Sequence, residues 1–187
     1  MILPDWDLIR DLTDGLSFWE EFIQRDELDS TNSFIRNRSD IKPGTIVLAS
    51  RQKHGHGKGK RKWYSPRGGL WFSFLVGCLP TSTSAEFYVV VLNLIKDLLA
   101  DYGVEARISH PNDLIAGGGK IAGMLIQESD DNYIIGIGIN VNNTVSSLPE
   151  SIGEHSTTMK ELTGKRVNLA EFLRDFMVRF AEYYGGA

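Results

Sequence analysis

Runs of β-branched and aromatic residues dominate the middle of the sequence, and one long stretch with helical periodicity interrupts them. Residues 45–52 (TIVLASRQ) and 69–77 (GLWFSFLVG) each have the length and composition of a buried strand. Between 84 and 102, apolar residues recur at helical spacing, and Gly103 stands where such a helix would stop. Strands that mix hairpins with helical crossovers predict an α+β domain, with a mixed β-sheet and helices mainly on one face.

The other elements are assigned from the same periodicities and turn signals. We expect a strand that ends in a polar turn at 22–32, further strands at 104–110, 120–129 and 132–142, and further helices at 33–40, 157–163 and 168–185. The last helix should begin at a capping box formed by Asn168 and Glu171. Residues 5–23 suit short amphipathic segments, and 111–119 reads as a loop or tight connection. Because no linker rich in Pro, Ser or Gly separates these elements, we expect a single domain over residues 1–187.

The composition excludes several classes of protein. Cys78 is the only cysteine, so no intrachain disulfide can form, and its place at the end of an apolar run predicts a buried thiol rather than a nucleophile. No apolar stretch approaches the roughly 20 residues that cross a bilayer. The N-terminus carries acids where a signal peptide would carry lysines. We therefore expect a cytoplasmic protein with no membrane partner.

Positive charge is concentrated in one glycine-rich stretch. Residues 51–63 read RQKHGHGKGKRKW and hold six Lys or Arg, two His, three Gly and no acid, whereas the whole chain has a formal charge of −4. Without the seven basic residues of 51–67, the remaining 13 basic residues face 24 acidic ones, a charge of −11. General polyanion binders spread basic charge over a face. The local concentration instead favours a pocket for one small anion.

The chemistry of this basic loop suits phosphate or carboxylate. Gly55, Gly57 and Gly59 allow close approach of the backbone to a ligand, and successive free N–H groups form an anion-binding nest. Arg61 adds a bidentate fork. The spacing fits neither a Walker A loop nor a Rossmann fingerprint. Trp63 can stack on a nucleobase or belong to the core, and the loop as a whole has a structural alternative, a solvated hairpin tip.

Three further motifs carry polar groups near the ends of expected strands, and each also has a purely structural interpretation. The turn DSTN (29–32) either caps the next helix or binds a polar ligand head group. In HPNDLIAGGGKIAGMLIQE (110–128), Lys120 either projects into a cavity beside Gly123 or lies exposed at the foot of a hairpin. In GIGINVN (136–142), a continuing strand would place the two asparagines on the same side, where they could hold a ligand.

In this order the motifs resemble one family. From about residue 25 to 142, the sequence is similar to the catalytic domain of biotin protein ligases, the enzymes that attach biotin to carboxylase subunits. The resemblance is carried by DSTN, by the spacing Q-x-x-G-x-G-x-x-x-R-x-W-x-S-P that starts at Gln52, by PND, by KIAGMLIQE and by GIGINVN. It implies an α+β fold related to class II aminoacyl-tRNA synthetase catalytic domains. Lipoate ligases share that fold, but their arginine-rich ligand loop is not seen here.

The resemblance also implies roles for individual residues. Biotin would be bound by Ser30, Thr31, Asn32, Gln52, Gly55, His56 and Gly123. The nucleotide would be bound by Lys58, Arg61, Trp63, Asn112, Asn140 and Asn142. Catalytic positive charge would come from Lys120, Arg61 and Lys58, with Lys120 meeting the biotin carboxylate. Mg²⁺ would lie near Asn112 and Asp113, in the region of the phosphates.

The implied reaction uses ATP to activate biotin as biotinyl-5'-AMP and transfers it to a lysine of a biotin carboxyl carrier protein. Because carboxylate and triphosphate repel each other, cations fixed in a water-poor site would lower the barrier most. Mg²⁺ would neutralise the leaving pyrophosphate, and a loop that orders over the mixed anhydride would protect it from water. Family members are monomers or homodimers.

Some family features have no counterpart within residues 1–187. Most members continue into a small SH3-like β domain, and the repressor-type members begin with DNA-binding helices, so we expect no DNA binding here. His56 and Lys58 stand where arginines are usual, and Ser109-His110 replaces the Lys-Trp that usually precedes PND. The lost charge would have to come from neighbouring lysines, Lys53, Lys60 or Lys62.

These replacements leave two alternatives open. The first is a homologue that binds biotin or another acyl adenylate without turnover. The second is a nucleic-acid-binding module that uses the basic loop and Trp63, which would bind oligonucleotides in a salt-sensitive way. The acidic balance of the rest of the chain argues against this second alternative.

Overall fold

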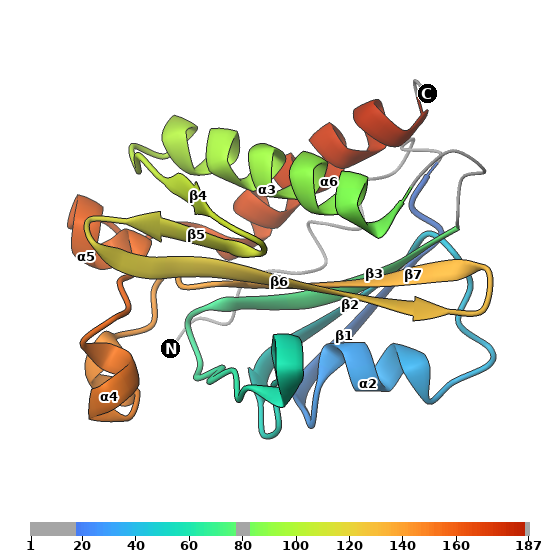
Figure 1. Ribbon diagram of the computed structural model, residues 1–187, viewed down its shortest axis with the longest axis horizontal. Helices are drawn as coiled ribbons and strands as arrows, with labels where there is room; N and C mark the ends of the chain where they lie inside the picture. The colour runs from blue at the N-terminus through green and yellow to red at the C-terminus, as the bar shows by residue number, and fades with distance from the viewer. Residues whose placement is uncertain (1–17, 78–82, 186–187) are drawn as a thin grey trace.

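The computed structural model describes residues 18–77 and 83–185 (Figure 1). The expected amphipathic segments before residue 18 and the expected buried thiol of Cys78 lie outside these ranges. Within them, no helix has the length and apolar character needed to cross a bilayer.

The centre of the fold is a seven-stranded mixed sheet with the order β1-β2-β3-β7-β6-β5-β4. β1 and β2 run parallel, and every other neighbouring pair is antiparallel. This sheet confirms the predicted α+β class. The strands are β1 (Glu21–Leu28), β2 (Thr45–Gln52), β3 (Leu70–Gly77), β4 (Arg107–Ser109), β5 (Asp113–Ala116), β6 (Gly119–Ser129) and β7 (Asn132–Ile139).

Two long helices cover one face of the sheet, and a short helix covers part of the other (Figure 1). α3 and α6 lie side by side on the first face, α2 packs on β2, β3 and β7 from the second, and α4 and α5 lie toward one end. The expectation of helices mainly on one face therefore holds. The helices are α2 (Thr31–Arg36), α3 (Ser84–Asp101), α4 (Glu150–Gly153), α5 (Met159–Thr163) and α6 (Leu169–Gly185), with 3-10 turns η1 (Lys58–Lys60) and η2 (Val145–Ser147).

β3 explains why the core is divided between the two faces. Phe72 and Phe74 point toward α6 and contact Phe176 at ring-centroid distances of 5.3 and 6.0 Å. Ser73, between them, points to the opposite face and reaches α2. All three are fully buried because successive strand residues alternate between two covered faces.

Two expectations on local structure were wrong. The segment expected as a loop at 111–119 contains strand β5, whose Leu114 and Ala116 are buried and whose turn into β6 uses the positive φ angles of Gly117 and Gly118. The strand expected to reach residue 142 ends at Ile139, so the two asparagines that follow are not related by strand periodicity. The short helix α4 was not expected.

Candidate active site

A cavity of about 500 Å³ opens on the sheet face that α2 partly covers. Its lining comes from the start of α2, the end of β2, the basic loop, β5 to β7 and the segment around α4. Segments far apart in the sequence therefore meet around one space. The residues that line it and were expected from the sequence are Ser30, Thr31, Asn32, Gln52, His56, Lys58, Arg61, Trp63, Asn112, Asp113, Lys120, Gly123 and Asn140.

One end of the cavity is polar and uncharged. Ser30 is the N-cap of α2, and its hydroxyl accepts from the Ser33 N–H at 3.4 Å. Thr31 donates its N–H to Gln52 Oε1 at 2.8 Å, and the amide group of Gln52 donates to the Ser65 hydroxyl at 2.7 Å. The interpretation of DSTN as a helix cap is thus confirmed, and the same turn also lines the cavity.

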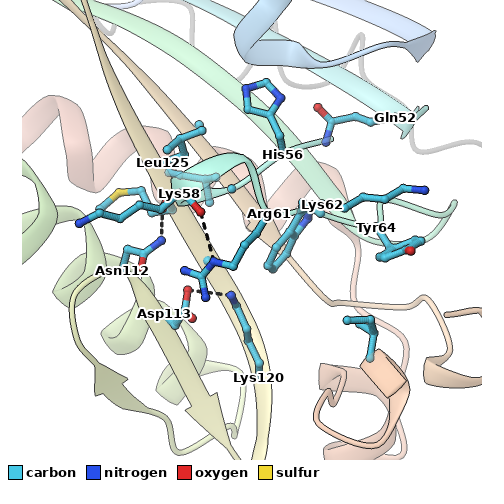
Figure 2. A pocket seen from close by; sticks show the side chains of 18 of the residues that line it. Gln52, His56, Lys58, Arg61, Lys62, Tyr64, Asn112, Asp113, Lys120 and Leu125 are labelled. Atoms are coloured by element: carbon cyan, nitrogen blue, oxygen red, sulfur yellow. Dashed lines mark hydrogen bonds and ion pairs between the residues drawn. The ribbon is translucent and has the colours of Figure 1, made fainter. Parts of the chain in front are cut away.

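The other end of the cavity is cationic. Lys120 Nζ lies 2.8 Å from Asp113 Oδ1 and 4.8 Å from the centre of the Trp63 ring. The Arg61 guanidinium donates through Nε to the Lys58 carbonyl at 3.1 Å, and in Figure 2 it points toward the Lys120–Asp113 pair. Lysines and an arginine from separate segments therefore converge on one space, as the sequence predicted for Lys120.

Trp63 lies between these two ends, on a bare part of the sheet. A Cβ added at Gly138 would lie 2.5 Å from Trp63 Nε1, and one added at Gly123 would lie 3.0 Å from the edge of the ring. These two glycines face each other across β6 and β7. The indole can approach the sheet only because both lack a side chain, which explains why small residues recur in KIAG and GIGI.

Some of the basic residues in 51–67 line the cavity, and others form ion pairs with acidic residues of β1. Arg51 and Lys53 pair with Glu27 on β1 at 3.3 and 2.7 Å, and Arg67 pairs with Asp26 through two bonds of 2.6 Å. Arg67 lowers the pKa of Asp26 by hydrogen bonding, and Lys53 does the same to the pKa of Glu27. None of the three cations lines the cavity.

Lys53 therefore does not replace the charge lost at His56 and Ser109, because Glu27 already neutralises it. Lys62 does line the cavity, where its ammonium lies 4.6 Å from the centre of the Tyr64 ring. His56 also lines it, with Nδ1 3.4 Å from the His54 carbonyl.

The three expected nucleotide-binding asparagines lie in different environments. Asn112 donates to the Met124 carbonyl at 2.8 Å, and its Oδ1 is buried beside the cavity without a hydrogen-bond partner. Asn140 lines the cavity and donates to the Lys120 carbonyl at 3.3 Å. Asn142 does not line it, because both ends of its amide bond the backbone of Val167 at 2.8 and 2.9 Å.

Gly55 likewise does not line the cavity. A Cβ at this position would lie 2.6 Å from the Trp63 carbonyl, so the glycine lets the two limbs of the basic loop approach each other. Its role in the structure is to shape the loop that carries the lining residues.

The segment around α4 was not expected in the site. The backbone of Lys120 pairs with this segment, since its N–H donates to the His155 carbonyl at 2.8 Å and its carbonyl accepts from Thr157 at 3.1 Å. This pairing brings a mixed apolar and polar set to the cavity, Leu148, Ser151, Ile152, His155 and Ser156. Ile152 is an apolar residue that is 39% exposed, and its exposure at the cavity is seen only in the structure.

Comparison with known proteins identifies the class of protein to which this fold and cavity belong. Residues 24–142 match the Biotin/lipoate A/B protein ligase family, so the chain belongs to that family. Within it, the chain is homologous to the catalytic region of biotin protein ligases.

Individual relatives support the same placement. The bifunctional ligase/repressor BirA of Bacillus subtilis is 26% identical over 175 residues, covering 88% of this chain and 54% of that protein. The biotin--[acetyl-CoA-carboxylase] ligase of Mycobacterium tuberculosis is 27% identical over 157 residues, covering 78% of this chain and 57% of that protein. The chain thus spans about half the length of these curated relatives.

Solved structures agree with the fold. The biotin protein ligase of Aquifex aeolicus in complex with biotin and ATP superposes with a TM-score of 0.80 at 33% identity, covering 88% of this chain and 70% of that one. The biotin protein ligase of Leishmania major in complex with biotinyl-5-AMP has a TM-score of 0.72 at 22% identity, covering 89% of this chain and 74% of that one, and supports the fold alone.

Proposed function

We propose that this chain is an ATP-dependent biotin protein ligase that makes biotinyl-5'-AMP and transfers biotin to a lysine of a biotin carboxyl carrier protein. Four cations, Lys58, Arg61, Lys62 and Lys120, line the cavity. The observation that carries the proposal is the division of this cavity, with uncharged hydrogen-bonding groups at one end and Arg61 beside Lys120 at the other. Biotin has the matching division, a neutral ureido ring and a carboxylate.

The two half-reactions place different demands on the site. In the first, a biotin carboxylate oxygen bonds to the α-phosphorus of ATP, and the bond to the bridging oxygen breaks to release pyrophosphate. In the second, the acceptor lysine nitrogen bonds to the acyl carbon, AMP leaves, and the nitrogen loses its proton. Both need developing negative charge to be stabilised where water is scarce, which fixed cations achieve at little reorganisation cost.

The proposed roles follow from where the side chains lie. Ser30, Thr31, Asn32 and Gln52 would bind the ureido ring, since all four line the uncharged end. Lys120 would meet the carboxylate and then the acyl phosphate, and Arg61 with Lys58 would bind the phosphates. The close contact of Trp63 with Gly123 and Gly138 puts its ring beside the path between the two ends.

The lining can also hold Mg²⁺ through the phosphates. This ion prefers oxygen ligands and commonly binds through one or two protein oxygens plus phosphates and water. Asn112 Oδ1 has no hydrogen-bond partner, and Asp113 lies next to it in the chain. The described residues contain no group of three or more His, Cys, Asp or Glu for a dedicated metal site. Bound Mg²⁺ would supply charge neutralisation for the departing pyrophosphate.

The direct test incubates the purified chain with biotin, Mg-ATP and a biotin carboxyl carrier domain. We expect biotin-dependent pyrophosphate release and biotin on the acceptor lysine, and a carrier domain with that lysine changed to arginine should remain unlabelled. Absence of both products, together with no biotin binding by calorimetry, would overturn the proposal.

One observation favours a second candidate, binding without turnover. Asp113 holds the Lys120 ammonium at 2.8 Å and offsets part of the charge that catalysis would use. Calorimetry that detects biotin binding while pyrophosphate release stays at background would identify this second function.

A further inference from the structure

Two polar residues, the buried Ser73 and the partly buried Gln127, bond the residues at the uncharged end of the cavity and do not line it themselves. Ser73 Oγ, on β3, lies 2.6 Å from Thr31 Oγ1 and 2.6 Å from Asn32 Oδ1. Gln127 Oε1, on β6, accepts from the Asn32 amide at 3.1 Å. Ser73 has no exposed surface, and Thr31 and Asn32 are 3% and 5% exposed, so the two bonds of Ser73 are shielded from water.

The side chain of Asn32 contacts three neighbouring strands. Ser73 and Gly136 face each other across β3 and β7, and Gln127 lies on the next strand, β6. A Cβ at Gly136 would lie only 1.9 Å from Asn32 Oδ1. The side chain of Asn32 therefore fills the space above Gly136, with one amide end bonded to Ser73 and the other to Gln127.

The donor and acceptor capacities of these groups decide which atom donates in each bond. The carbonyl oxygen of Asn32 can only accept, so the single hydroxyl proton of Ser73 goes to it. The Thr31 hydroxyl, which also lies 2.6 Å from Ser73 Oγ, donates its own proton to Gln52 Oε1 at 3.1 Å. In this arrangement the Thr31 oxygen keeps acceptor capacity for a ligand, and the second amide proton of Asn32, beyond the one given to Gln127, remains a donor.

We propose that Ser73 and Gln127 are positioning residues that fix the orientation of Thr31 and Asn32 and so set specificity for a neutral head group with adjacent N–H and C=O groups. This inference rests on the proposed function. It assigns Ser73 and Gln127 an indirect role, because they would act on the head group only through Thr31 and Asn32. A site preorganised in this way discriminates strongly, because a mismatched ligand leaves buried polar groups unpaired.

The test compares four single variants of the whole chain. Ser73→Ala removes the shared hydroxyl, and Gln127→Met removes the acceptor at similar length. For each we expect the Kd and KM for biotin to rise on the order of 5- to 20-fold, with kcat and the KM for ATP within about twofold of the unsubstituted chain. Gln127→Glu keeps an acceptor, so its Kd for biotin should stay within about threefold of that of the unsubstituted chain.

The matched control is Thr45→Val. Thr45 is also a buried hydroxyl, 1% exposed on the adjacent strand β2, but its Oγ1 has no hydrogen-bond partner and it does not line the cavity. Its substitution should leave the Kd for biotin unchanged. Calorimetry gives Kd, pyrophosphate release gives kcat and KM, and circular dichroism checks that each variant is folded.

The outcomes separate this inference from the proposed function. If the unsubstituted chain binds biotin and Gln127→Met binds it equally well, the positioning role is wrong while the function stands. If Gln127→Met and Gln127→Glu weaken binding equally, the acceptor role is wrong. If the unsubstituted chain binds no biotin, both proposals fail. Because Gln127 is only partly buried, its variants decide the matter even if Ser73→Ala does not fold.

Discussion

At Lys120, one ammonium group contacts a carboxylate and an indole within the same cavity. The side chain is 28% exposed and that of Asp113 is 21% exposed, so the pair is screened less than a surface pair. Asp113 holds the ammonium beside Trp63, and a bound anion would have to share or replace this contact. The environment of this residue thus comes from two other segments of the chain.

We expect Lys120→Ala to abolish most adenylate formation while the protein remains folded. Removing one preorganised donor that meets developing charge typically costs about 10²–10³-fold in kcat, which pyrophosphate release would measure. Lys96→Ala on α3 is the matched control, because the side chain is partly exposed and does not line the cavity, and it should keep full activity. Unchanged turnover in Lys120→Ala would show that Lys120 is not catalytic.

At the scale of elements, helix ends and glycine turns decide where the chain changes direction. Thr83 caps α3 in a complete capping box, in which its hydroxyl accepts from the Glu86 N–H and Glu86 accepts from the Thr83 N–H at 2.6 Å. At the start of α6, Asn168 accepts from the N–H of Ala170 at 3.0 Å and from that of Glu171 at 3.5 Å. The cap at Asn168 was expected from the sequence, and the one at Thr83 was not.

Thr83→Ala should lower the free energy of unfolding by about 1 kcal/mol, because it removes an N-cap acceptor from α3. Chemical denaturation followed by circular dichroism measures the change. Thr83→Ser keeps the hydroxyl and should cost much less. Equal stability of all three proteins would mean that the capping box does not stabilise the helix.

At the scale of the whole molecule, α6 and the sheet share one aromatic core. Phe176 has no exposed surface and contacts Phe72, Phe74 and Phe180. Just before α6, the backbone of Val167 bonds the Asn142 amide in the segment after β7.

Phe176→Ala should destabilise the protein by about 3–5 kcal/mol, because it removes buried area and leaves a cavity between α6 and β3. Thermal or denaturant unfolding measures the loss. Val89→Ala, on α3 and 55% exposed, is the control and should change stability by less than about 0.5 kcal/mol. A small effect at Phe176 would contradict the packing described for α6.

The pairing of β1 acids with loop cations should be visible in a pH titration. Arg67 lowers the pKa of Asp26, so the stabilisation by this pair is present above the unfolded value of about 3.9 and is lost as the pH falls through the folded value. Arg67→Gln should raise the pKa of Asp26 toward 3.9 in an NMR titration. Asp40, whose pKa Arg38 lowers, should not change. An unchanged pKa of Asp26 would show that the pair does not form in solution.

Several features could be predicted because they depend on local pattern. β2 follows from its β-rich composition after the turn at Pro43-Gly44, and α3 follows from helical periodicity that ends before Gly103. The turn at Asp130-Asp131 between β6 and β7 follows from its polar residues. β5 was missed because four residues next to three glycines give too little pattern to distinguish a strand from a loop.

What the sequence by itself determined is most of the long helices and strands, the α+β class and the residue types that could hold an acid, a phosphate and a polar ring. Only the tertiary structure decided which charges reach the cavity. Lys53 and Lys58 lie five positions apart in one basic run, yet Glu27 neutralises the first while the second lines the site. The reason is physical: a charge acts on whatever lies within a few ångströms, and that neighbourhood is set by strand pairing across the sheet rather than by distance along the chain.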